Sequence, residues 1–114
     1  MEALEMTLLF DYYGDLLTDR QRSCLDLRYN QDLSLGEIAQ ELGVSRQGVY
    51  DNLSRAEALL RNMEEKTGWV AYSLKSQRAL AQITEAASVL QQHSDPTVQQ
   101  LANHILAAAD LMKE

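Results

Sequence analysis

Residues 34 to 56 decide the fold, and they read SLGEIAQELGVSRQGVYDNLSRA. Ser34 and Glu37 have the spacing of a capping box, in which each side chain bonds the other residue's backbone amide. A helix is therefore predicted to begin at residue 35. Gly43 is expected to end it, and Ser45 to cap a second helix. The first helix has one apolar side at three- and four-residue steps, made by Leu35, Ile38, Ala39 and Leu42.

The second helix combines a buried stripe with an outward face. Its apolar residues step by four, three, four and three: Val49, Leu53, Ala56, Leu60 and Met63. At about 100° per residue, the opposite face carries Gln47, Asp51, Ser54, Arg55, Ala58 and Asn62. Arg46, Tyr50 and Arg61 lie on its flanks. This is the sequence form of a helix-turn-helix unit, which usually binds nucleic acid, although the same pattern also occurs as a packing unit in helical bundles.

The stretch from Leu17 to Arg61, LTDRQRSCLDLRYNQDLSLGEIAQELGVSRQGVYDNLSRAEALLR, resembles the promoter-reading region 4 of bacterial sigma factors. The acidic start MEALEMTLLFDYYGDLLT and the helical tail rich in alanine and glutamine are similar instead to the small bacterial YlxM family. This second resemblance covers the whole chain. It implies an all-α protein whose genes lie beside those of the signal recognition particle GTPase, and a role as regulator or accessory factor of that targeting pathway.

The charge pattern argues against strong binding to phosphate. The net charge is −7, and residues 1–66 carry seven basic side chains against thirteen acidic ones. Asp51 lies near the centre of the outward face, where a carboxylate repels phosphate, and the sequence has Tyr50, Asp51 and Asn52 where sigma-like helices carry Lys, Arg or Gln. Few of the roughly 6 to 10 phosphate contacts of a typical DNA binder are therefore expected.

Length and composition favour one ordinary globular chain: 114 residues, 46% apolar and 24% charged. No apolar run approaches the ~20 residues of a membrane span, and no secretory signal is apparent, so a cytoplasmic protein is predicted. The single cysteine, Cys24, is expected in the core. His93 and His104 lack metal-ligand spacing, and no nucleophile, phosphate loop or carboxylate pair is seen, so we predict no enzyme, cofactor or metal.

The remaining pattern predicts an all-α chain with helices on both sides of the helix-turn-helix. One helix is expected from about Glu2 to Tyr13, with Leu4, Leu8, Leu9 and Tyr12 on one side. A second should follow a Thr18 cap and run to about Tyr29. Gly68 is expected to end the recognition helix, and Trp69, Val70 and Tyr72 to form a short aromatic segment. Residues 1–68, with the helix-turn-helix at 34–66, are thus predicted to form one domain, and residues 69–114 a helical tail.

The tail is predicted to mediate self-association. Ser94, Asp95 and Pro96 mark a break between two helices whose apolar residues repeat at three and four. This repeat is close to the 3.5-residue seam of paired helices. A homodimer is expected, with a monomeric hairpin as the alternative. The seam residues are Leu80, Ile83, Leu90, Val98, Leu101, Ile105 and Met112.

Three functional hypotheses follow. The first is a regulator that binds DNA or RNA through the recognition helix. The second is an adaptor that contacts the protein or RNA of the signal recognition particle without reading DNA. The third is a helical scaffold whose helix-turn-helix only packs. For the first two, the contact residues are Ser45, Arg46, Gln47, Tyr50, Asp51, Asn52 and Arg55.

Overall fold

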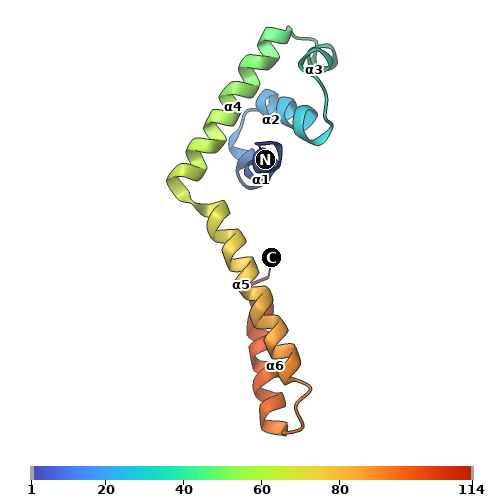
Figure 1. Ribbon diagram of the computed structural model, residues 1–114. Coiled ribbons are helices and arrows are strands. Elements are labelled where there is room, and N and C mark those ends of the chain that lie inside the picture. The colour runs from blue at the N-terminus through green and yellow to red at the C-terminus, as the bar shows by residue number, and fades with distance from the viewer. Residues whose placement is uncertain (1, 114) are drawn as a thin grey trace. The chain divides into compact units, whose positions relative to one another are not determined.

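The structure is a computed structural model that describes residues 2–113. Its helices are α1 Glu2–Tyr13, α2 Asp19–Leu25, α3 Leu35–Leu42, α4 Arg46–Thr67, α5 Trp69–Leu90 and α6 Pro96–Leu111, with a 3-10 turn η1 at Gly14–Leu16 and a π turn η2 at Asp26–Asn30 (Figure 1). No strand occurs within residues 2–113. The all-α prediction is confirmed.

The chain divides into two compact units, and the boundary between them along the sequence lies between Val70 and Ala71. The first unit holds α1 to α4 and the first two residues of α5. The second holds the rest of α5 and α6. The dimerising role of the tail stays a prediction at this stage.

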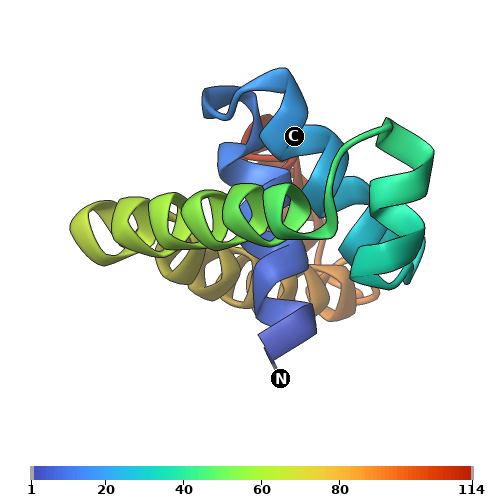
Figure 2. The ribbon, with the colours of Figure 1, turned by 90° about the horizontal axis from the view of Figure 1, so that it is seen from above.

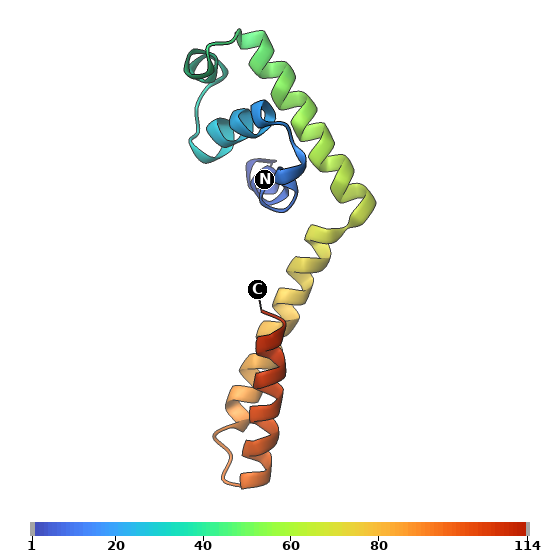
Figure 3. The same cartoon turned by 180° about the vertical axis from the view of Figure 1, so that it is seen from behind.

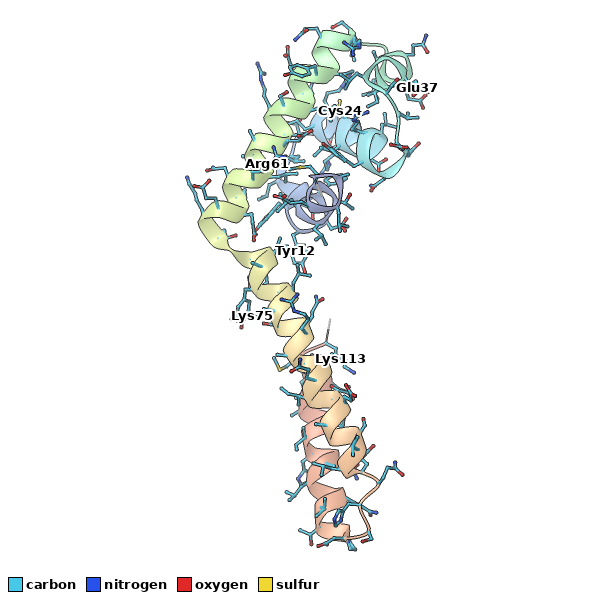
Figure 4. All side chains as sticks on the ribbon, viewed as in Figure 1. Tyr12, Cys24, Glu37, Arg61, Lys75 and Lys113 are labelled. Atoms are coloured by element: carbon cyan, nitrogen blue, oxygen red, sulfur yellow. The ribbon has the colours of Figure 1, made fainter. Side chains whose placement is uncertain are left out.

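The core of the first unit forms around α4. This helix packs against α1, α2 and α3, and Figure 2 shows α1 crossing it. The predicted stripe on α4 is buried at Val49, Leu53, Ala56 and Leu60. The other fully buried side chains of this unit are Met6, Cys24, Leu25 and Ile38, and Figure 4 shows Cys24 on the part of α2 that meets α4.

The buried side of α1 differs from the predicted one. Met6, Leu9 and Tyr13 are buried, whereas Leu4 is 65% exposed. The apolar residues of α1 continue around much of the helix, so the sequence pattern did not distinguish one side. Packing against α4 selects the side that carries Met6 and Leu9.

The second helix begins as predicted and ends differently. Thr18 caps it through a complete capping box with Gln21. After Leu25 the backbone widens into η2, where the Gln31 amide donates to the Asp26 carbonyl at 3.2 Å. The Asp26 carboxylate accepts bonds from the side chains of Asn30 and Gln31, at 2.8 and 3.3 Å. These contacts replace the last α-helical turn that was expected to reach Tyr29.

The helix-turn-helix has the predicted caps. Ser34 and Glu37 form the capping box, with bonds of 2.8 and 3.1 Å, and hydrogen bonds from Ser34 hold the pKa of the outward Glu37 (Figure 4) below its usual value. Gly43 adopts the left-handed backbone with φ 67°, which glycine accepts without a steric penalty. Ser45 Oγ then accepts the Gly48 amide at 2.9 Å and caps α4.

The predicted aromatic segment after Gly68 is wrong, because α5 begins at Trp69 directly after the left-handed Gly68. Only Gly68 separates α4 from α5, and side chains at the end of α4 bond the first amides of α5. Thr67 Oγ1 accepts the Trp69 amide at 3.2 Å, and Glu64 Oε1 accepts the Val70 amide at 2.9 Å. The Tyr13 hydroxyl also donates to Glu64 Oε1 at 2.7 Å. The new helix therefore has its first amides satisfied at once.

In the second unit, α5 and α6 form an antiparallel hairpin (Figure 3). The break between them has the predicted form, since Asp95 caps α6 through the Thr97 amide at 2.8 Å and Pro96 occupies the first turn. The Gln99 side chain donates to the His93 carbonyl at 2.7 Å and closes the connection.

Candidate nucleic-acid interface

The first three turns of α4 present the predicted contact residues on a rigid support. Val49, Leu53 and Ala56 hold this part of the helix in the core, with exposed fractions of 0, 5 and 0%. The side chains of Arg46, Gln47, Tyr50, Asp51, Ser54 and Arg55 are exposed. The structure thus brings the outward residues onto one surface, which we call the α4 face: Arg46, Gln47, Tyr50, Asp51, Ser54 and Arg55.

Two hydrogen bonds order the polar groups of this region. The Gln47 side-chain amide donates to Asp51 Oδ1 at 3.1 Å. The Asn52 amide donates to the Gly48 carbonyl at 2.9 Å, and this side chain is half-buried. Asn52 therefore lies along the helix rather than outward, with its carbonyl oxygen and its second amide hydrogen left for another contact. Ser45 Oγ is engaged by Gly48 but keeps its hydroxyl hydrogen.

Arg46 and Arg55 supply the positive charge of the α4 face. Neither makes a hydrogen bond or ion pair with any other residue in the described range 2–113. They are nine residues apart, so they point to opposite flanks of the helix, about 13 Å apart along its axis. Two other arginines of this unit are engaged: Arg22 pairs with Asp19, and Arg28 donates to the Leu33 carbonyl at 3.0 Å.

A half-buried tyrosine supports α4 beside this face. The Tyr29 hydroxyl donates to Glu57 Oε2 at 2.9 Å, and Arg61 lies 3.8 Å from Glu57 Oε1. Burial and the adjacent Glu57 carboxylate raise the pKa of Tyr29 to about 12. Glu57 is therefore used internally, which reduces the negative charge available at the surface. Sequence reasoning missed this contact, because residues 28 positions apart along the chain give no local signal.

The other candidate residues have structural surroundings. Cys24 is fully buried, and burial raises the pKa of its thiol. His93 accepts the Asp95 amide through Nδ1 at 3.0 Å, in the turn between α5 and α6. Over the described residues, no group of three or more His, Cys, Asp or Glu side chains is arranged to hold a metal ion. None of the described helices combines the length and apolar character needed to cross a membrane.

The predicted seam residues of the tail divide into two groups. Leu80 and Val98 are half-buried. The other five remain exposed, by 50% at Ile83, 42% at Leu90, 56% at Leu101, 39% at Ile105 and 68% at Met112.

Known proteins share this sequence over most of its length. Residues 1–101 match the family model UPF0122, described as "Putative helix-turn-helix protein, YlxM / p13 like". A UPF0122 protein of Acetivibrio thermocellus is 52% identical over 89 residues, which is 77% of this chain and 76% of the relative. One from Halalkalibacterium halodurans is 49% identical over 85 residues, covering 75% and 78%.

A third relative extends the match into the tail. The UPF0122 protein of a Thermoanaerobacter species is 43% identical over 105 residues, covering 91% of this chain and 90% of the relative. The alignment therefore includes both the helix-turn-helix and most of the α5–α6 hairpin. The chain belongs to the UPF0122 family of YlxM- and p13-like helix-turn-helix proteins.

Proposed function

We propose that this protein is a cytoplasmic regulator that binds nucleic acid through the α4 face. The observation that carries the proposal is the pair of unengaged arginines, Arg46 and Arg55, on opposite flanks of an exposed polar helix face. Their separation suits a helix lying in a major groove about 12 Å wide, with one cation toward each phosphate backbone. Ser45 and the α4 N-terminus would meet phosphate, while Gln47, Tyr50 and the Asn52 carbonyl approach bases.

The charge of α4 limits the expected affinity. The helix balances four positive side chains (Arg46, Arg55, Arg61 and Lys66) against four negative ones (Asp51, Glu57, Glu64 and Glu65). Only two of the positive charges lie on the α4 face, and Asp51 is between them. With a slope of about −0.9 per phosphate, binding by one helix should weaken with salt at a logarithmic slope near −2. A homodimer presenting two helices to one duplex would approximately double this slope.

The test is a charge reversal with a matched control. The double variant Arg46→Glu, Arg55→Glu should abolish binding to short fluorescent duplex DNA and hairpin RNA, measured by anisotropy at several salt concentrations. Lys75→Glu, Arg78→Glu changes the net charge equally but in the tail, and should bind like wild type. Binding that does not respond to salt would refute the phosphate contacts. A control pair that loses binding equally would show that total charge, rather than the α4 face, is responsible.

The second candidate is an adaptor of the signal recognition particle that contacts its GTPase and reads no DNA. It is favoured by one observation: Tyr50 is an aromatic side chain left 55% exposed on the α4 face, one helical turn after Arg46. Tyrosine and arginine dominate protein interfaces, so Tyr50 and Arg55 would anchor the partner. A pull-down from cell extract, scored for both RNA and protein and repeated with Tyr50→Ala, separates the two candidates. Tyr50-dependent recovery of the GTPase without RNA supports the adaptor.

A further inference from the structure

The α5–α6 hairpin is closed by small side chains. Its most deeply buried residues among those described are Ala87, Ala102 and Ala109, exposed by 1, 0 and 5%. Thr84 Oγ1 is also buried and has no hydrogen-bond partner. Small residues let two helices approach closely. We call the buried and half-buried row between the helices the inner seam. It comprises Leu80, Thr84 and Ala87 of α5, Gln91 just after α5, and Val98, Ala102, Leu106 and Ala109 of α6.

A second row of apolar side chains lies beside the inner seam on each helix. On both helices they directly precede a seam residue: Ile83, Ala86 and Leu90 on α5, and Leu101, Ile105 and Ala108 on α6. Each is therefore rotated by about 100° from the seam in the same sense. Because the helices are antiparallel (Figure 3), the same rotational sense on each places these residues on one face of the hairpin. Met112, four residues after Ala108, continues this apolar face.

The opposite face is polar by the same geometry. The residues that directly follow seam positions include Glu85, Ser88, Asn103 and Asp110. On this side the Gln91 amide donates to Asn103 Oδ1 at 2.6 Å and links the two helices. The side that carries Ile83, Leu90, Leu101 and Ile105 therefore exposes a row of large apolar side chains on both helices, and this row gains from being covered.

We propose that the apolar face is covered by the same face of a second copy, so that two hairpins form a four-helix bundle. This inference deepens the homodimer included in the proposed function, and it rests on the tail alone. The apolar face carries no charged residue, and the tail from Ala71 onward has three basic and four acidic side chains, a net of −1. The apolar faces of two copies therefore do not repel each other electrostatically. The face also offers no cation that could bind a phosphate of nucleic acid.

The size of the face suits a two-fold contact between identical surfaces. With a rise of 1.5 Å per residue, the sixteen residues of α6 span about 24 Å, and two helices side by side are about 20 Å wide. Such a face covers on the order of 500 Å² per copy, so two copies would bury roughly 1,000 Å², the lower end of specific interfaces. A contact between identical patches also closes the assembly at two subunits.

The experiment compares exposed apolar residues on the apolar face with others away from it. Ile83→Glu and Leu101→Glu place a charge on the face. Val89→Glu and Leu111→Glu are the matched controls, because Val89 and Leu111 are 68 and 88% exposed, more than Ile83 and Leu101. They lie about 90° around each helix from the apolar face, on the side away from the inner seam. Sedimentation equilibrium of the full chain should show wild type and both controls as dimers at micromolar concentration. Each face variant should dimerise at least about a hundredfold more weakly, because like charges meet across the interface.

Folding is checked separately by circular dichroism, since unfolding of the hairpin would lower the helical signal of the full chain. A wild-type chain that stays monomeric at micromolar concentration would overturn the proposal, as would control variants that dissociate as readily as the face variants. The dimerisation measurement does not depend on nucleic-acid binding. The Arg46→Glu, Arg55→Glu protein should lose nucleic acid and still dimerise, so failure of one proposal is distinguishable from failure of the other.

Discussion

Asp51 gives the sharpest test of whether the α4 face meets nucleic acid. Its carboxylate is exposed between Arg46 and Arg55 and accepts a hydrogen bond from Gln47. In the proposed complex it would face the groove between the two phosphate backbones and repel them. Replacing it with arginine removes this repulsion and adds a cation, while the exposed position leaves the core of α4 unchanged.

The expected gain follows from two contributions. At about 0.1 M salt, a slope of −0.9 per phosphate makes one new contact worth about eightfold in affinity. Removing a carboxylate a few ångströms from phosphate in water contributes up to ~1 kcal/mol, or about threefold to fivefold. Asp51→Arg should therefore bind roughly 20-fold to 40-fold more tightly per helix. Asp51→Asn retains an acceptor for Gln47. Its affinity should rise only by the threefold to fivefold that comes from removing the carboxylate charge.

The assay is fluorescence anisotropy with the same duplex DNA and hairpin RNA over a range of salt concentrations. Asp51→Arg should steepen the logarithmic salt slope by about 0.9, whereas Asp51→Asn should leave the slope nearly unchanged. Equal affinity for wild type and Asp51→Arg would refute the reasoning, because it would mean that the α4 face points away from the nucleic acid. Tighter binding by Asp51→Arg without a change in slope would refute the phosphate contact itself.

Three further predictions concern the framework. Ile38→Ala should lower the free energy of unfolding by about 2–5 kcal/mol in urea titrations, since Ile38 is fully buried, whereas Leu4→Ala at a 65% exposed position should change it by less than about 0.5 kcal/mol. Tyr29 should ionise near pH 12 in an ultraviolet absorbance titration. Because this pKa is raised above the unfolded value, the stabilisation is complete below pH 10 and is lost as pH rises from about 10 to about 12; Tyr29→Phe should lack this loss. Cys24 should react with a thiol reagent only on unfolding, and rapid reaction of the native protein would contradict its burial.

The caps of the helix-turn-helix could be predicted from the sequence because each depends on residues within a few positions. The Ser34–Glu37 box, the left-handed turn at Gly43 and the Ser45 cap are all local bonds. The exposed side of α4 was also predictable, since helical rotation fixes it once the buried stripe is recognised. The hydrogen bonds of Gln47 and Asn52 within that region depend on rotamer choice, which the pattern does not determine.

Features that depend on distant residues could not be predicted. The start of α5 at Trp69 requires Glu64 and Thr67 to cap its amides, and Tyr13, 51 positions before Glu64, to engage the same carboxylate. The buried side of α1 is likewise chosen by α4. In the tail, the 3.5-residue repeat indicated paired helices but not which row of residues would face the partner within the same chain.

Which row of tail residues faces the partner helix within the same chain affects how the tail and the α4 face relate to function. If the large apolar residues had closed the hairpin, the second unit would need no partner. Instead its most deeply buried described residues are alanines, and Ile83 and Leu101 remain half exposed. A dimer brought together by these residues would carry two α4 faces, each with only two available arginines. Linking two weak sites raises the overall affinity without new contacts, provided both reach one ligand. Self-association through the tail is therefore the physical means by which so acidic a chain could retain useful affinity for nucleic acid.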